Sequence, residues 1–329
     1  MRFAGERVPG ETRFSDCAVP KLPFDEQTRL SWAKALPCPS QVPEAYQSFF
    51  AAGPGRDSHF SYIILTPSYA GFLHRAREKL ICCSDGRICI LEIQRQTLKC
   101  TAFAYENISS IELGTCLLDS WITLRGTTDQ GIPAASTIKF NSVTDYLFRP
   151  ILEKMRPATN QASGADCEVE RAKFDCLAQA DYKFMRYARR SIRPGAQVIR
   201  FVWQPELCTR LMTLFGQTLY HSLACAHIEI LTESELIIIR DDKHADWEGG
   251  RPYGGIWTYI PLDKIVAAAL TEDSGDLATL AIELPHDEQV TSVFSGPNQP
   301  HAEELLRHIR LLAARPAESP PNKKSPVPL

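Results

Sequence analysis

The chain has 329 residues, of which 44% are hydrophobic and 23% charged, and its formal net charge at pH 7 is −3. This length leaves room for two domains with buried cores, and the composition excludes a disordered chain. The small net charge excludes a general attraction to nucleic acid or anionic lipid, so such a partner would need a local basic patch. No apolar run is long enough to span a membrane, and charges interrupt the N-terminal segment, which predicts a cytoplasmic protein.

Residues 1–49 are predicted to form a helical extension ahead of the first domain. The amphipathic pattern "FDEQTRLSWAKAL" at 24–36 indicates one short helix. A second pattern, "VPEAYQSFFAAG" at 42–53, indicates another, and the proline-containing "PCPSQ" separates the two.

Residues 50–156 contain a run of predicted strands. The segment "SYIILTP" at 61–67 opens the run, and "LICCSDGRICIL" at 80–91 has the apolar, turn, apolar pattern of a hairpin. The segments "SWITL" at 120–124 and "STIKF" at 136–140 alternate with the period of two that half-buried strands show. Together these segments predict a domain of antiparallel strands.

An amphipathic helix, "NSVTDYLFRPILEKM" at 141–155, is predicted to close this domain. Ser142 and Asp145 fit a capping box, and Pro150 is expected to kink the helix. The expected apolar face consists of Val143, Tyr146, Leu147, Ile151, Leu152 and Met155.

Residues 157–195 are predicted to link this domain to a second one. The segment "ATNQASGA" at 158–165 has the composition of a flexible linker, and 166–192 has the pattern of one long helix. The side chains of that helix available for packing are Val169, Phe174, Leu177, Phe184, Tyr187 and Ala188.

Residues 196–313 repeat the pattern of the first domain. The strand "VIRFVWQP" at 198–205 corresponds to 61–67. The segment "IEILTESELIII" at 228–239 matches the hairpin at 80–91 residue for residue. The remaining segments of the copy are strands at 277–284 and 290–294 and a helix that starts at Pro300 and presents Ala302, Leu305, Leu306, Ile309 and Leu312.

The spacing of the two copies supports a duplication. The phrases "AYENISSIEL" and "PLDKIVAAAL", which follow the two hairpins, make Ile108 and Ile265 equivalent. From Ile108 to Met155 and from Ile265 to Leu312 the separation is 47 residues in both copies. Each copy is therefore predicted to be a strongly bent antiparallel sheet whose open end is covered by its terminal helix.

The phrases "CCSDGRICIL" followed by "YENISSIEL", and "ILTESELIII" followed by "YIPLDKI", resemble the bacterial pleckstrin-homology-like (PH-like) domains. The resemblance covers about residues 50–156 and 196–313 and rests on patterns of residue type. It implies an α+β, mainly β fold: two bent antiparallel β-sandwich or roll domains, each closed by a C-terminal helix, joined by a helical linker. The chain departs from the family pattern at Pro150 and in an extended loop at 241–256. The tail at 314–329 has too little apolar material to fold.

The eleven cysteines are an odd number scattered along the chain, which predicts reduced thiols rather than a disulfide framework. Three of them fall in "KLICCSDGRICILEI" at 79–93, which raises the question of a zinc or redox site. Cys82 and Cys83 must point to opposite faces of a strand. Cys89 and Cys100 do not provide the separations that let thiolates converge on zinc. We therefore expect these cysteines to pack as apolar residues, with no metal bound.

The loop "RDDKHADWEGGRPYGG" holds four carboxylates and one imidazole, namely Asp241, Asp242, His244, Asp246 and Glu248. Bound divalent metal is one interpretation, but the spacing matches no defined metal loop and the glycine pairs favour a solvated hairpin loop. The aromatic residues that follow, Tyr253, Trp257 and Tyr259, suit either the core of their own strand or an exposed contact surface. We favour the core.

Two groups of basic residues are the candidate ligand-binding sites. The first group, just ahead of the first hairpin, consists of His74, Arg75, Arg77 and Lys79. In eukaryotic relatives of the PH fold a basic loop near the first two strands holds inositol phosphates. The second group lies on the predicted linker helix, where Lys183, Arg186 and Arg190 share one face that is able to meet phosphate groups or an acidic loop. A solvated helix face is the commoner meaning of such a charge run.

The sequence contains no nucleophile elbow, phosphate loop, dinucleotide fingerprint or paired-histidine motif, so we expect no enzyme activity, no catalytic residues and no cofactor. The expected function is that of a non-catalytic binding or scaffold protein in a bacterial cytoplasm. It would contact a protein partner or its own copies through sheet edges and loops. The alternative is peripheral membrane association through an anionic lipid headgroup held by the basic residues. No nucleic acid partner is expected.

Overall fold

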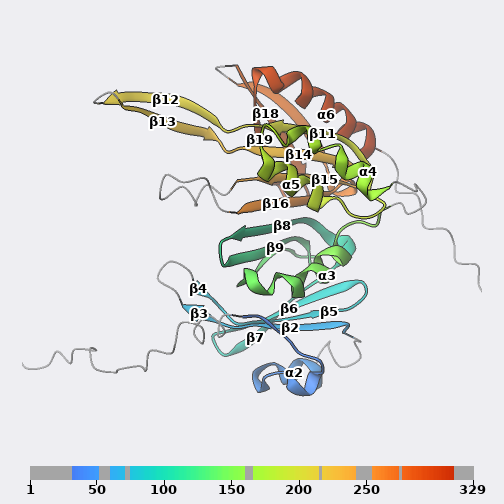
Figure 1. The fold of residues 1–329 in the computed structure, drawn as a ribbon. Helices are drawn as coiled ribbons and strands as arrows, with labels where there is room; N and C mark the ends of the chain where they lie inside the picture. The colour runs from blue at the N-terminus through green and yellow to red at the C-terminus, as the bar shows by residue number, and fades with distance from the viewer. Residues whose placement is uncertain are drawn as a thin grey trace, which may run out of the picture.

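The computed structural model describes residues 32–51, 60–70, 75–159, 166–214, 217–241, 254–273 and 276–314 (Figure 1). The protein is mainly β, and the paired strands in the described residues are antiparallel. The expected α+β, mainly β class is confirmed at this level. None of the described helices combines the length and the apolar character needed to cross a membrane.

The first half of the chain folds as two groups of strands and a closing helix. Its elements are α2 Glu44–Ala51, β1 Lys34–Ala35, β2 Tyr62–Thr66, β3 Tyr69–Ala70, β4 Arg75–Ala76, β5 Lys79–Cys83, β6 Arg87–Gln94, β7 Thr97–Ala104, β8 Ile108–Cys116, β9 Asp119–Thr127, β10 Pro133–Asn141 and α3 Asp145–Met155. A five-stranded sheet has the order β1-β2-β5-β6-β7, and β8, β9 and β10 follow in a second sheet. The small β3–β4 hairpin is inserted between β2 and β5.

The second half repeats this order after a connecting segment. Its elements are α4 Cys167–Ala172, α5 Tyr182–Ser191, β11 Val198–Gln204, β12 Leu207–Leu214, β13 Gln217–Ala224, β14 His227–Thr232, β15 Glu235–Arg240, β16 Gly255–Pro261, β17 Ala267–Asp273, β18 Leu277–Leu284, β19 Glu288–Ser295 and α6 Gln299–Ala313. The β12–β13 hairpin occupies the place that β3–β4 has in the first half. Short 3-10 turns, Tyr105–Asn107 and Leu262–Lys264, precede Ile108 and Ile265 in the two halves. The predicted strands, hairpins and closing helices are thus present in both copies.

The two halves are joined edge to edge into one seven-stranded sheet, in the order β10-β9-β8-β16-β15-β14-β11. The joining pair is β8 with β16, which runs from Ile111 opposite Tyr259 to Thr115 opposite Gly255. Gly254 precedes this ladder with φ at +124°, and a Cβ there would lie 1.9 Å from the Thr115 carbonyl oxygen. Only glycine allows the chain to approach β8 so closely.

Each half buries both faces of the four-stranded part that begins it. In the first half, Cys83 on β5 faces the core shared with β8, β9 and α3, whereas Cys82 faces a second core formed with Tyr46 and Phe49 of α2. Figure 1 shows α2 covering the outer side of this sheet. In the second half, α5 covers the outer face of β14 and β15 in the same way. The expectation that Cys82 and Cys83 point to opposite faces is confirmed.

The expectation of one long linker helix over 166–192 was wrong. The segment forms α4, a 3-10 turn at Asp175–Leu177 and α5. Asp181 caps α5, its Oδ1 accepting a hydrogen bond from the Phe184 amide at 3.0 Å. The break lets Phe174 and Phe184 both reach the core, and both are fully buried. Most of the predicted flexible linker, residues 160–165, lies outside the described residues.

Two further expectations at helices need correction. Residues Lys34–Ala35 of the first predicted N-terminal helix form β1, while residues 24–31 lie outside the described part. In the closing helix of the first half, Val143 and Tyr146 are 48% and 62% exposed, and Phe148 is buried instead. The reason is that a 3-10 turn precedes α3 and shifts the buried stripe. Ser142 makes no cap here.

A buried ion pair connects the end of the first half to the second half. Arg156, which follows α3, donates from Nε and Nη2 to the two carboxylate oxygens of Glu235 on β15 at 3.1 and 2.6 Å. Both side chains are almost fully buried, at 3% and 0% exposure. The guanidinium also lies 4.2 Å from the Tyr259 ring centroid and donates to the Ser191 carbonyl at 3.0 Å. Such a bidentate, multiply bonded pair tolerates burial because each partner satisfies the other.

We predict that Arg156→Ala lowers the free energy of unfolding by about 3–5 kcal/mol, because Glu235 would be left buried without its main partner. The double variant Arg156→Met, Glu235→Leu removes both charges and should be less destabilised than either single variant. Urea denaturation followed by circular dichroism measures both quantities. A double variant whose loss equals the sum of the single losses would contradict this account.

The interior of the second half also holds two buried titratable side chains on β14. Burial lowers the pKa of His227 from 6.5 to about 4 and raises the pKa of Glu229 from 4.5 to about 7. Both side chains face the three-stranded sheet β17-β18-β19, where His227 packs edge-on against Phe294 with ring centroids 5.1 Å apart. Burial therefore shifts both groups toward their uncharged forms, although the Glu229 carboxyl still ionises as the pH rises past about 7.

We predict that Glu229→Gln changes how stability depends on pH. In the unfolded state of the unmodified protein the Glu229 carboxyl ionises above about pH 4.5, whereas in the folded state it ionises only near pH 7. The free energy of unfolding of the unmodified protein therefore falls as the pH rises from about 4.5 to about 7. Glutamine does not ionise, so the variant should gain about 3 kcal/mol relative to the native protein across this window and no more above it. Denaturation midpoints at several pH values measure the difference. His227 lowers the stability of both proteins equally below about pH 6.5, so its effect cancels in the difference between them. A difference in the free energy of unfolding that stays constant with pH would refute the raised pKa of Glu229.

Candidate functional site

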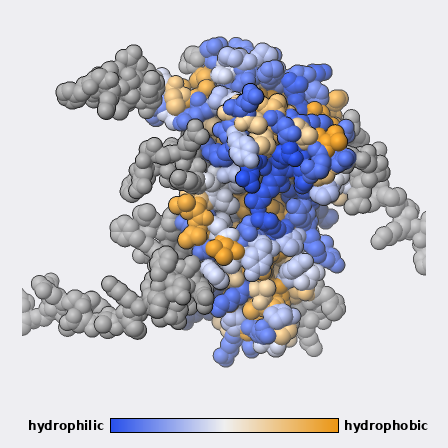
Figure 2. Space-filling view, viewed as in Figure 1, coloured by the Kyte–Doolittle hydropathy of each residue, from blue (hydrophilic) through white to orange (hydrophobic). Residues whose placement is uncertain are grey.

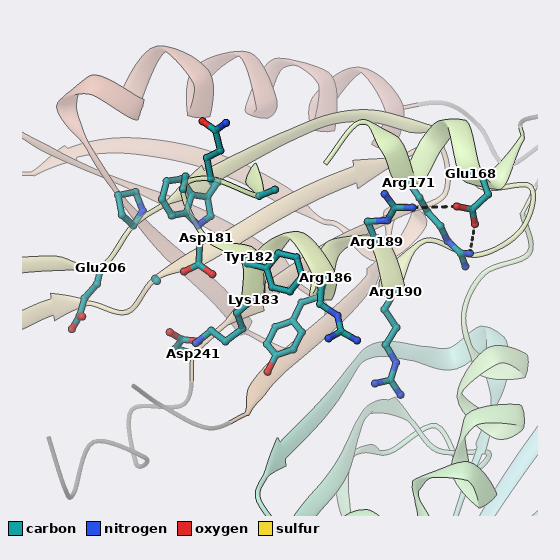
Figure 3. A pocket seen from close by; sticks show the side chains of 17 residues that line it. Glu168, Arg171, Asp181, Tyr182, Lys183, Arg186, Arg189, Arg190, Glu206 and Asp241 are labelled. Carbon is teal, nitrogen blue, oxygen red and sulfur yellow. Dashed lines mark hydrogen bonds and ion pairs between the residues drawn. The ribbon is translucent and has the colours of Figure 1, made fainter. Parts of the chain in front are cut away.

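Lys183, Arg186 and Arg190 of the second basic group lie together along one open groove of about 1340 Å³. All three project from α5, and the groove extends over the α4–α5 connection to the start of β12. In Figure 3, Glu206 and Asp241 lie at one end of the groove and Glu168 lies at the other. The expectation that these three basic residues share a helix face is confirmed, while their role in binding stays a prediction.

The amphipathic pattern of α5 places these cations outward. Phe184, Met185 and Ala188 are buried and face the core, where α5 contacts β14 and β15. Residues at the complementary positions, three and four apart, then line the outer side. Figure 2 shows a hydrophilic surface over this part of the molecule.

Carboxylates already neutralise three of the five basic side chains in the groove. The Lys183 ammonium lies 2.6 Å from the Asp241 carboxylate. Glu168 lies between Arg171 and Arg189, at 2.9 and 3.2 Å. The ion pairs of these three cations stabilise the segment from α4 to α5, so the three side chains are already engaged within the protein.

Arg186 and Arg190 are the groove cations that remain open. Arg190 is 65% exposed and lies at a long 3.5 Å from Asp145. Arg186 is exposed, and among the described residues no carboxylate lies within ion-pair distance of it. Its guanidinium lies 6.0 Å from the Tyr182 ring centroid, a cation–π distance. Arg186 therefore carries uncompensated positive charge, and Arg190 is only weakly compensated, because Arg149 engages the same Asp145 carboxylate more closely, at 2.7 Å.

The groove also has apolar walls. Tyr182 is 60% exposed, and Trp203, Pro205 and Ala226 line the groove beside it. Aromatic and apolar surface next to exposed arginine is the composition that protein-binding surfaces favour. The arrangement suits an extended segment with acidic and apolar side chains better than a compact anion.

The first basic group lies elsewhere, and Arg77 and Lys79 share a single carboxylate. His74 lies outside the described residues, and Arg75 belongs to the β3–β4 hairpin. Arg77 and Lys79 both pair with Glu92, at 3.0 and 3.3 Å, and the Lys79 ammonium donates to the Thr137 carbonyl at 2.8 Å. The structure does not bring this group together with the α5 groove.

Most of the acidic loop that the sequence offers as a metal site, residues 242–253, lies outside the described part. Asp241, at its start, is engaged by Lys183. Trp257 and Tyr259 are buried at 8% and 4% exposure, which confirms that these aromatic residues belong to the core. Within the described ranges, no three His, Cys, Asp or Glu side chains gather so that they could hold a metal ion.

The sequence analysis did not predict the carboxylates that form ion pairs with the basic residues of the groove. Glu168 and Asp241 lie 15 residues before Lys183 and 58 residues after it, and the fold brings both to α5. One local signal was present, because Glu168 and Arg171 have the i, i+3 spacing of a helical ion pair. The Asp241 contact depends on the pairing of distant strands and has no local signal.

Comparison with known proteins does not assign this groove to a class. A scan of the chain against protein-family models gave no match, and a search of curated proteins found no significantly similar sequence.

The thiols of β5 provide a test of the packing interpretation. Burial raises the pKa of the Cys83 thiol to about 12 and raises that of Cys82 further still. A thiol reacts as its thiolate, so we predict that iodoacetamide at about pH 8 modifies exposed Cys100 and Cys176 at least about 100-fold faster than Cys82 and Cys83. Peptide mass spectrometry after timed alkylation measures the rates, and denatured protein, in which all should react alike, is the control. Rapid modification of Cys82 in the native protein would contradict the buried packing.

Proposed function

We propose that this chain is a non-catalytic binding protein that holds an acidic, partly apolar segment of a protein partner in the α5 groove. The observation that carries the proposal is the pair of open arginines, Arg186 and Arg190, beside an exposed tyrosine in a groove whose other cations are neutralised. Arginine forms paired hydrogen bonds with carboxylates and stacks on aromatic rings, so both features serve one partner.

The repeated element order supports a tandem PH-like architecture for this protein. Apart from β1 and the inserted hairpins β3–β4 and β12–β13, each half has four strands, then three, then a helix over the open end, which is the arrangement that the resemblance implies. In this proposal residues 50–156 and 196–313 are the two PH-like domains. Residues 157–195 are then more than a linker, since α4 and α5 form the groove and cover a sheet face. The N-terminal extension 1–49 covers the other sheet through α2, and 314–329 remains a tail.

The charges of the groove favour a protein segment over a membrane surface. Four carboxylates, Glu168, Asp181, Glu206 and Asp241, line the groove alongside its five basic side chains. A membrane with anionic lipids attracts clusters of uncompensated basic residues, whereas a mixed surface matches a partner of mixed charge. Glu92 partly compensates Arg77 and Lys79, which also weakens the case for headgroup binding at the first basic group.

The test is a binding titration with defined peptides. A fluorescein-labelled peptide of alternating Glu and Leu is the probe, and its Gln-for-Glu counterpart is the matched peptide. We predict that the full chain binds the acidic peptide at least about tenfold more tightly, and that raising the salt concentration weakens this binding. Arg186→Glu and Arg190→Glu should each reduce the affinity at least about tenfold, since each replaces attraction with repulsion.

Arg95→Glu is the control variant, because Arg95 is equally exposed but lies in the distant turn between β6 and β7. It should leave the affinity within about twofold. Equal affinity of native protein and Arg186→Glu would refute the proposal. So would failure to bind the peptide combined with flotation on phosphatidylserine vesicles that Arg186→Glu abolishes, since that result would identify lipid as the ligand. A third outcome is that the chain forms dimers, that the peptide competes with dimer formation, and that Arg186→Glu dissociates the dimers. That outcome would place the acidic segment on a second copy of this chain and would support the α5 groove as the binding site.

A further inference from the structure

A second cavity, of about 410 Å³, lies inside the second half, away from the face of α5 that bears the open arginines. One wall is a cross-strand row of β14, β15 and β16 in which His227 pairs with Arg240 and Arg240 pairs with Ile256. The facing wall is Thr291–Val293 of β19. The cavity size is within the range of roughly 300–1,000 Å³ that small-molecule sites occupy.

His227 offers an unused hydrogen-bond acceptor to this cavity. The side chain lines the cavity although the residue is only 5% exposed. Its Nδ1 lies 3.1 Å from the Cys225 carbonyl oxygen, which can only accept, so the proton resides on Nδ1. The Nε2 atom then carries a lone pair, and it is buried without a partner. A buried imidazole with one satisfied and one unsatisfied nitrogen is uncommon in a folded protein.

Glu229 is a second buried acceptor beside residues that line this cavity, although its own side chain is not part of the lining. It lies two residues from His227, on the same face of β14, and is fully buried. Ile238, its partner on β15, and Ser292 both line the cavity. The Ser292 hydroxyl is close enough to lower the pKa of this carboxyl slightly, yet neither carboxylate oxygen makes a hydrogen bond of normal geometry. The His227 Nε2 atom is thus an acceptor without a donor, and the neighbouring Glu229 carboxyl has only the Ser292 hydroxyl close to it, so both are able to accept from a donor that comes from outside the fold.

The charged residues at the rim are already committed. Arg240 lies 3.4 Å from Glu112, and Asp241 lies 2.6 Å from Lys183. The remaining wall is apolar, with Ile238, Ile256 and Val293. The cavity thus combines one unsatisfied acceptor, His227 Nε2, with an alkyl-compatible body, which matches an amphiphilic cation that carries N–H groups.

We propose that this cavity binds a small organic ammonium ion, with its N–H groups donating to His227 Nε2 and its positive charge facing Glu229. The alkyl part would lie against the isoleucines and valine of the wall. A metal ion is the poorer fit, since these two side chains do not belong to any group of three metal-ligating residues within the described ranges. The site is independent of Arg186 and Arg190, so its test is separate from that of the α5 groove.

The experiment titrates the full chain with n-butylammonium chloride and follows the His227 ring nitrogens by NMR. Saturable binding with a shift of Nε2 is expected. Tetramethylammonium, which has the charge but no N–H donor, should bind at least about tenfold more weakly. Affinity should fall about 30-fold from about pH 8 to about pH 5.5, because a carboxyl with a pKa of about 7 is ionised at the first and protonated at the second. The other titratable side chains that line the cavity, Cys225, Arg240 and Asp241, are unchanged in the variants.

Glu229→Gln and His227→Phe should each weaken binding at least about tenfold, and Glu229→Gln should also abolish the pH effect. Both keep the size of the side chain, and the stability of each is checked by denaturation. Glu106→Gln, at an exposed carboxyl distant in sequence, should bind like the native protein. Three results would each overturn the proposal. The first is equal affinity for the two ammonium ions, and the second is native-like binding by both cavity variants. The third is a titration with n-butylammonium that shows no saturation, which would mean that only water fills the cavity.

Discussion

The pairing of β8 with β16 is the constraint on which the rest of this structure depends. It converts two separate rolls into one body, because the second sheet of the first half and the first sheet of the second half become a single seven-stranded sheet. The hydrophobic core that follows is continuous from α3 to α5. Arg156 and Glu235 then lock the same junction from inside. Helix α5, which bears the groove, packs on β14 and β15 of this joined sheet.

Burial on both faces explains the composition of the central strands. A sheet with one wet face alternates apolar and polar residues, but β5, β6 and β15 contain unbroken apolar runs at 80–83, 88–91 and 236–239, and β14 is buried at every position. Helices α2 and α5 supply the second cover. Three of the cysteines in the first hairpin are therefore fillers of a two-sided core, where a small apolar side chain packs well.

The sequence predicted the repeated strands and the closing helices because their periodicity is local. Ile108 and Ile265, for example, mark the same turn in both halves, and both copies place a strand after it. The break between α4 and α5 was missed because apolar spacing alone continues across it, and the Asp181 cap becomes informative only once the turn is known. Of the residues that line the groove, the sequence predicted only basic ones, Lys183, Arg186 and Arg190, as a binding surface. Its carboxylates arrive through long-range strand pairing, which no local pattern records.

The joint also has a consequence for synthesis of the chain. Strand β8 ends at residue 116 and its partner β16 begins at residue 255, so roughly 140 residues separate the two. At translation rates of about 5–20 residues per second, β8 waits on the order of ten seconds with an unpaired edge. The nascent first half therefore passes through a stage open to association with neighbouring chains, and a chaperone that shields sheet edges would act on it then.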